Sequence, residues 1–112
     1  MRYLILFVFL VGCGDDTDVA QDCSSALNWT TVGAPFIYTW CTPCHSPTLS
    51  DPVDRQYAWL DVNLGSLEDV KTHADRIERV IFHPGATMPP AGGPSSEELE
   101  AIADWFACGL PE

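Results

Sequence analysis

Apolar residues recur at helical spacing in the second half of the chain. Between residues 66 and 82 the intervals are three or four residues, with charged residues in most of the remaining positions. The apolar positions are Leu67, Val70, Ala74, Ile77 and Ile81. This spacing predicts one amphipathic helix. Ser66 can cap its start, because an acidic residue follows three positions later.

A second periodic stretch closes the chain. Ser95 or Ser96 can cap a helix with two glutamates in its first turn, where negative charge suits the helix dipole. Gly109 is a typical helix stop. Trp105 is expected to lie to one side of the apolar stripe. That stripe comprises Leu99, Ile102, Ala103 and Phe106.

The residues from Ser24 to Trp40 are compatible with a helix and rich in aromatic side chains. Pro35 suits the start of a helix, where the missing backbone N–H is not needed. Gly33 and Ile37 lie eight and four residues before Cys41, so they fall on one helical face. This stretch therefore predicts a helix that leads into Cys41.

The beginning of the chain is typical of a bacterial lipoprotein signal peptide. A short positive head is followed by an apolar run from Tyr3 to Val11. That run is too short for a permanent membrane span, which needs about 20 residues. Cys13 follows Leu10-Val11-Gly12, and this resembles the lipobox, in which the cysteine is acylated and becomes the first mature residue.

These features predict a chain in three parts: a signal peptide over 1–12, a flexible tether over 13–22 and a folded domain over 23–112. Acyl chains on Cys13 would anchor the protein to a membrane of the cell envelope, facing the periplasm or the outer surface. Gly14 stands where the inner-membrane retention signal of some bacteria has an aspartate. The outer membrane is therefore favoured, and the inner membrane stays open.

The chain is strongly acidic. It carries 16 Asp and Glu against 5 Lys and Arg, for a net charge of −11. This charge argues against nucleic acid as a partner, because phosphate binding needs the opposite sign. It favours a protein partner with a basic docking face, although solubility alone would also account for it.

The most specific motif is Cys41-Thr42-Pro43-Cys44-His45. The pattern C-x-x-C-H attaches a c-type haem. Two thiols on one helical turn can reach the vinyl groups at one porphyrin edge, and the adjacent imidazole can reach the iron. A thiol redox pair or half of a zinc site are the alternatives. The sequence has no second C-x-x-C or H-x-x-x-H to complete a zinc site, and no strand is indicated before Cys41.

A haem iron held by His45 needs a ligand on its other side, and Met88 is the best candidate. It lies 43 positions after His45 and is followed by two prolines, which hold the chain extended and restrict the methionine backbone. His83 is the rival sixth ligand and would give bis-histidine ligation. His73 is expected to be a partly exposed helix histidine.

These two motifs resemble those of the class I cytochromes c, the small monohaem electron carriers. The chain is most similar to the short, lipid-anchored bacterial members with a Met-Pro-Pro segment before the last helix. The resemblance covers residues 23–112. It implies an all-α class I cytochrome c fold, with three or four short helices around one covalently bound haem c.

The function that the resemblance implies is one-electron transfer between redox protein partners, without enzyme activity or a small-molecule substrate. Two other functions stay open. The protein could be a haem-based sensor or an accessory electron-entry module of a larger oxidase. It could also be a haem-free thiol oxidoreductase that uses Cys41 and Cys44.

The resemblance also suggests roles for the loop after His45. In the family a backbone carbonyl from this region accepts a hydrogen bond from the proximal histidine, and Pro47 and Pro52 are the candidates. Arg55 would suit a haem propionate as a paired donor. Alternatively, Arg55 is a solvated surface residue that pairs with Asp51 or Asp54.

In the family the first and last helices cross. A small residue and a bulky one, here Gly33 and Ile37, meet aromatic residues of the last helix. Aromatic residues before Cys41, such as Trp40, could face the porphyrin. The same crossing would bring Cys23 and Cys108 together, and an oxidising compartment would pair them as a disulfide. Two free buried thiols are the alternative.

Overall fold

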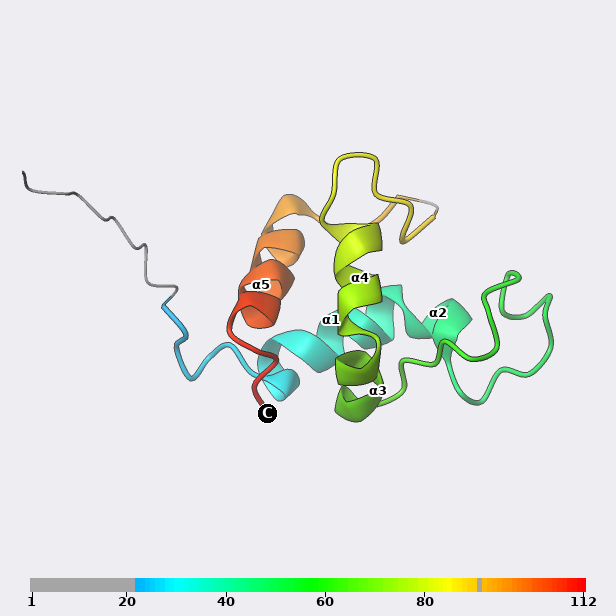
Figure 1. Ribbon diagram of the computed structural model, residues 1–112, viewed down its shortest axis with the longest axis horizontal. Helices are drawn as coiled ribbons and strands as arrows, with labels where there is room; N and C mark the ends of the chain where they lie inside the picture. Colours follow the sequence, from blue (N-terminus) through cyan, green and yellow to red (C-terminus); the bar gives the residue numbers. More distant parts are fainter. Residues whose placement is uncertain (1–21, 91) are drawn as a thin grey trace, which may run out of the picture.

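The computed structural model describes residues 22–90 and 92–112, and within these residues the chain is helical and has no β-strand. The prediction of an all-α fold is therefore confirmed for this part of the protein. In chain order the elements are the π-helix η1 (Trp29–Gly33) and the α-helices α1 (Ala34–Trp40), α2 (Thr42–His45), α3 (Leu67–Thr72), α4 (Ala74–Ile81) and α5 (Ser96–Ala107) (Figure 1).

The first helical segment is longer than the sequence indicated. α1 begins at Ala34, with Pro35 in its first turn as predicted, but η1 extends the helical chain five residues upstream. The Asn28 side chain caps η1 by accepting a hydrogen bond from the backbone N–H of Thr31 at 3.0 Å. A side-chain acceptor at this position satisfies one of the free donors of the first turn.

The middle helix is interrupted, whereas the sequence predicted one continuous helix. α3 and α4 are separated by His73, whose backbone leaves the helical region with φ −105° and ψ 11°. Ser66 caps α3 as predicted, by accepting a hydrogen bond from the backbone N–H of Asp69 at 3.2 Å. The predicted apolar face still points inward on both sides of the break. Its buried members are Leu67, Val70, Ile77 and Ile81.

The last helix begins as predicted, with Ser95 as its N-cap. The Ser95 side chain accepts from the backbone N–H of Glu98, and the Glu98 carboxylate accepts from the backbone N–H of Ser95, which together form a capping box. Trp105 packs against the first helical segment at Gly33 and Trp29, as the resemblance implied for the aromatic residues of the last helix. Trp105 is 0% exposed, because Gly33 leaves room for its ring and its indole N–H donates to the carbonyl of Pro111 at 3.0 Å.

The crossing of η1 and α5 closes the fold. A Cβ added to Gly33 would lie 2.8 Å from the ring of Trp105, so this contact requires a glycine. The chain end returns to the same place, where the backbone N–H of Trp29 donates to the carbonyl of Pro111 at 3.0 Å. Figure 1 shows the C-terminus beside the start of the first helical segment.

The predicted disulfide is present. Cys23 and Cys108 are bonded across 85 residues of chain, and their Cα atoms are 5.6 Å apart. The bond joins the segment before η1 to the end of α5, beside the crossing of the two elements. The alternative of two free thiols at these positions is therefore wrong.

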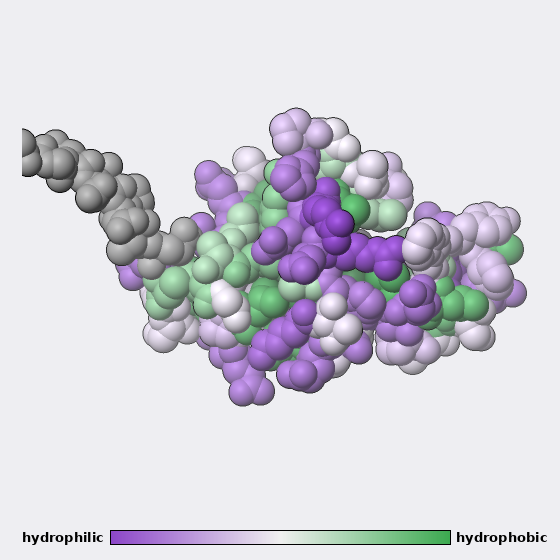
Figure 2. Space-filling view, viewed as in Figure 1, coloured by the Kyte–Doolittle hydropathy of each residue, from purple (hydrophilic) through white to green (hydrophobic). Residues whose placement is uncertain are grey.

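A long loop without regular secondary structure connects α2 to α3 and extends to one side of the helices (Figure 1). The backbone N–H of Leu64 donates to the carbonyl of His45 at 2.8 Å, which brings the end of this loop back to its start. In the face that Figure 2 shows, strongly hydrophilic residues cover the centre, with hydrophobic residues visible between them and in the loop region.

Candidate haem-binding site

A cavity of about 470 Å³ lies between the C-x-x-C-H segment, the long loop, α4 and the Met-Pro-Pro segment. Its volume falls within the range of about 300–1,000 Å³ that is usual for small-molecule and cofactor sites. The walls are mostly apolar and aromatic, as such sites generally are. Besides the candidate ligands they include Trp40, Trp59, Val62, Leu64, Ile77, Val80 and Ile81.

Both cysteines of the motif line this cavity. Cys44 and His45 donate their backbone N–H groups to the carbonyl of Cys41, at 3.2 and 2.9 Å, so the motif forms a single helical turn. Cys41 is buried and Cys44 half-buried, and both carry free thiols. Burial raises the pKa of the Cys41 thiol to about 12. The Cys41 thiol is therefore neutral at ordinary pH.

His45 is held in one orientation by the long loop. Its Nδ1 atom lies 2.9 Å from the carbonyl oxygen of Val62. A carbonyl can only accept, so Nδ1 carries a proton and Nε2 is the nitrogen that can serve as a metal ligand. His45 also lines the cavity. The prediction that Pro47 or Pro52 supplies this carbonyl is wrong, because the loop folds back so that a residue near its end lies beside the ring.

Met88 lines the cavity, on a segment 43 positions after His45. The segment returns over α4, where the backbone N–H groups of Thr87 and Met88 donate to the carbonyl of Val80 at 3.1 and 3.3 Å. The Met88 side chain remains 39% exposed. The two thiols, His45 and Met88 thus line one cavity.

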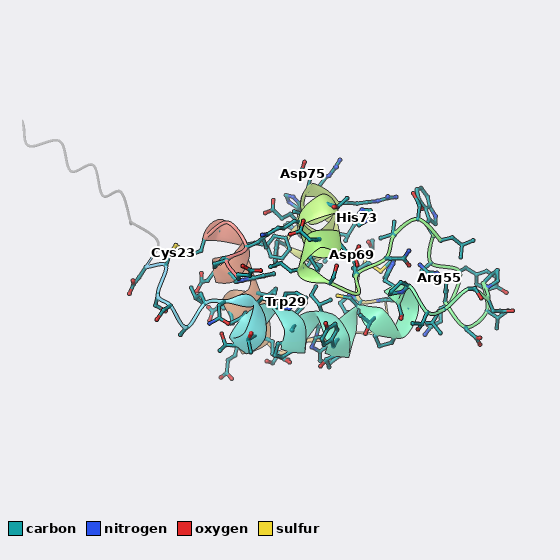
Figure 3. The ribbon with its side chains drawn as sticks, turned by 90° about the horizontal axis from the view of Figure 1, so that it is seen from below. Cys23, Trp29, Arg55, Asp69, His73 and Asp75 are labelled. Atoms are coloured by element: carbon teal, nitrogen blue, oxygen red, sulfur yellow. A yellow bond between two sulfur atoms is a disulfide. The ribbon has the colours of Figure 1, made fainter. Side chains whose placement is uncertain are left out.

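Of the two rival histidines, His73 is partly exposed as expected, whereas His83 does not lie at the cavity. His83 is exposed and is not among the residues that line the cavity. His73 is half-buried and does line it, at the break between α3 and α4 (Figure 3). His73 precedes Ile77 and Val80, which also line the cavity, by four and seven positions. Helical spacing is therefore a usable signal for this placement. Among the histidines, His73 is therefore the closer rival of Met88.

Arg55 is a buried charged residue of the long loop. Its side chain is 1% exposed, so the alternative of a solvated surface arginine beside Asp51 or Asp54 is wrong. Each guanidinium nitrogen donates at least one hydrogen bond within the loop region (Figure 3). The acceptors are the carbonyls of Ser46, Leu49, Ala58, Trp59 and Val62 and the side-chain oxygen of Asn63, at 2.7–3.3 Å.

This network organises the loop around one side chain. Directly after Arg55, Gln56 and Tyr57 have φ values of 50° and 63°. Left-handed backbone is unfavourable for non-glycine residues and persists where the surroundings determine it. Pairing of Arg55 with a haem propionate stays a prediction, and a direct bond would replace one of the present acceptors. Sequence reasoning missed the network, although Arg55 is the one arginine of the loop over 46–66, which is a usable signal.

The aromatic walls are also fixed by polar contacts. The indole N–H of Trp40 donates to the carboxylate of Glu98 at 3.2 Å, which ties α1 to the first turn of α5. The guanidinium of Arg76 lies 4.5 Å from the ring centre of Trp59, a cation–π distance. This contact connects α4 to the long loop, both residues line the cavity, and sequence reasoning did not find it.

The residues present fit a covalently attached haem. Two thiols share one helical turn, one histidine nitrogen is available as a donor, a thioether lies on the same cavity, and the walls are apolar. Within residues 22–90 and 92–112, no three His, Cys, Asp or Glu side chains converge as a site for a metal ion on its own.

The described residues include no helix that is long and apolar enough to cross a membrane. The predicted signal peptide over 1–12, the predicted acylation site Cys13 and residues 13–21 of the predicted tether lie outside the described residues. Comparisons with protein-family models, with curated proteins and with solved structures find no match for this chain.

Proposed function

We propose that this protein is a one-electron carrier with the class I cytochrome c fold, holding one covalently attached haem c. The observation that carries the proposal is the convergence of Cys41, Cys44, His45 and Met88 on one cavity. Met88 is 43 positions from His45, and nothing local requires it to lie on the same cavity. A site for a haem with one histidine and one thioether ligand needs this convergence.

Each residue has a distinct role in the proposal. Cys41 and Cys44 would attach the haem through thioether bonds, and His45 and Met88 would be the residues that hold its iron. Haem iron supplies the one-electron couple. A methionine ligand raises its reduction potential relative to two histidines. With His45 and Met88 both bound to it, the iron would have no open site for a substrate, which suits a carrier better than an enzyme.

The haem-free thiol oxidoreductase receives less support from the site. A reactive cysteine needs a stabilised thiolate, and its pKa is usually lowered. Burial raises the pKa of Cys41 to about 12 instead. A neutral, buried thiol at the edge of an apolar cavity is a better candidate for covalent attachment than for disulfide exchange.

The test is an optical spectrum of protein matured in a bacterial periplasm, recorded in the oxidised and reduced states. We expect a red protein whose haem stays attached after extraction with acidified acetone. The oxidised protein should show the weak far-red band of sulfur–iron ligation. A colourless product, or pigment that the solvent removes, would refute the proposal.

Ligand variants test the sixth position. Met88→His should abolish the far-red band and lower the potential, because two histidines replace a histidine and a methionine. His83→Ala and His73→Ala are the matched controls and should keep the band. Binding of carbon monoxide to the reduced wild-type protein would instead favour the sensor function, since a gas needs a ligand that leaves.

The expected partners are redox proteins with a basic docking face, because the chain carries a net charge of −11. The proposed location is the cell envelope, with the domain tethered through an acylated Cys13. Electron transfer to a candidate partner should then slow as salt is added, because screening weakens charge-steered association.

A further inference from the structure

One carbonyl group connects the proposed haem ligand to the buried arginine. The oxygen of Val62 accepts a hydrogen bond from Nδ1 of His45 at 2.9 Å and a second one from Nη2 of Arg55 at 3.0 Å. The two donors therefore share a single acceptor. Because they share this oxygen, a stronger hydrogen bond from one donor weakens the hydrogen bond from the other.

The position of the guanidinium is determined independently of His45. Nη2 also donates to the carbonyl of Trp59 at 2.8 Å, and Nη1 donates to the carbonyl of Ser46 at 2.7 Å. A planar guanidinium with several fixed acceptors has little freedom to rotate. Arg55 therefore holds the Val62 carbonyl where the ring of His45 meets it.

The charge of Arg55 is not neutralised by a carboxylate within its network. Its acceptors are backbone carbonyls and the amide oxygen of Asn63, and its side chain is 1% exposed. A hydrogen bond from an ionised donor is roughly twice as strong as a neutral one. The Val62 oxygen is thus strongly engaged by Arg55 and is a weaker acceptor for His45.

We infer that Arg55 is a positioning residue that tunes the electron affinity of the site through the Val62 carbonyl and His45. This inference rests on the proposed function. A strong hydrogen-bond acceptor at Nδ1 makes a ligating histidine donate more electron density to the metal. This stabilises the oxidised state of the metal. Arg55 weakens that acceptor, so it favours the reduced state.

Two other roles for Arg55, a purely structural one and a simple effect of its charge, predict different results. If Arg55 only held the loop together, its loss would lower the stability without a specific change at His45. A simple effect of its positive charge would persist in Arg55→Lys, which keeps the charge but replaces the fork by one ammonium group. The route through the carbonyl predicts that lysine does not substitute for arginine.

The experiment uses the haem-loaded, full-length protein with the variant Arg55→Lys. At a fixed potential we expect the ratio of reduced to oxidised protein to fall about tenfold, which corresponds to about 59 mV for a one-electron couple. In the reduced protein the NMR resonance of the Nδ1 proton of His45 should move downfield, as its hydrogen bond to Val62 strengthens.

A second variant keeps Arg55 itself and removes one other bond of the loop, from the Asn63 amide N–H to the carbonyl of Leu60 at 3.2 Å. Asn63→Asp leaves the Arg55 fork in place but sets a carboxylate against it, since Asn63 accepts from Nη1 at 3.1 Å. The same two changes are expected, in the same direction. Ser50→Asp is the matched control, because it adds the same charge to an exposed position of the loop and should move the His45 resonance little.

The inference is overturned if both variants are red and folded but the ratio changes less than twofold and the His45 proton does not move. It is also overturned if Asn63→Asp and Ser50→Asp behave alike. A colourless wild-type protein would refute the proposed function and this inference with it. If the wild type and both variants are red but the reduced-to-oxidised ratio and the His45 proton resonance stay the same, this inference alone is refuted.

Discussion

The absence of a side chain at Gly33 decides how η1 and α5 cross. An added Cβ would lie 2.6 Å from Cε3 of Trp29 and 2.8 Å from two ring carbons of Trp105. The ring of Trp105 cannot move away freely, because it is fully buried and its indole N–H is bonded to Pro111. Gly33→Ala is therefore an overpacking mutation in the core.

The expected change in the free energy of unfolding for Gly33→Ala follows from two opposing effects. Overpacking a well-filled core costs about 1–3 kcal/mol, and three contacts below 3.0 Å place Gly33→Ala in the upper part of that range. Alanine regains about 1 kcal/mol from its higher helix propensity. We expect the free energy of unfolding to fall by about 1–2 kcal/mol.

The assay is urea unfolding of the haem-loaded protein, followed by far-UV circular dichroism. The midpoint should decrease while the slope stays constant, which identifies a change in stability rather than in exposed surface. Ala34→Gly is the matched control, because it changes helix propensity at the next position in the opposite sense. A Gly33→Ala variant that is as stable as the wild type, or more stable, would refute the packing argument.

Two further predictions concern the cap of α5 and the disulfide. The pKa of Glu98 is lowered, first by the backbone N–H of Ser95 and then by the indole of Trp40. Its contribution to stability is therefore present above its ordinary pKa of 4.5 and is lost as the pH falls through the lowered value. Below pH 4.5 the free energy of unfolding should therefore fall less with pH for Glu98→Gln than for the wild type. Glu97→Gln is the control and should follow the wild type. Identical acid unfolding curves for all three proteins would contradict this prediction. Replacing Cys23 and Cys108 together by alanine opens a loop of 85 residues and should lower the free energy of unfolding by about 4–5 kcal/mol. Urea unfolding of the wild type with and without reductant gives an independent measurement, and a loss below about 1 kcal/mol would contradict the chain-entropy estimate.

Features that depend on near neighbours could be predicted from the sequence. The capping box at Ser95, the serine cap of α3 and the single helical turn of the C-x-x-C-H motif each involve residues at most four positions apart. Local hydrogen bonds and helical spacing decide such features, and both are written directly in the order of the residues. The pairing of Cys23 with Cys108 was predicted by a different route, from the resemblance to a family in which the terminal helices cross.

Features that depend on distant segments were decided only by the tertiary structure. The carbonyl that fixes His45 comes from Val62, 17 positions away, and no local pattern distinguishes it from the other carbonyls of the loop. Arg55 is buried although arginine is usually exposed, because the loop supplies oxygen acceptors from several turns. The cavity includes His73 and not His83. Composition and spacing thus determine the chemical groups that the chain carries and the short elements that hold them. Which of those groups meet depends on how the loop and the last helix close over α1 and α4.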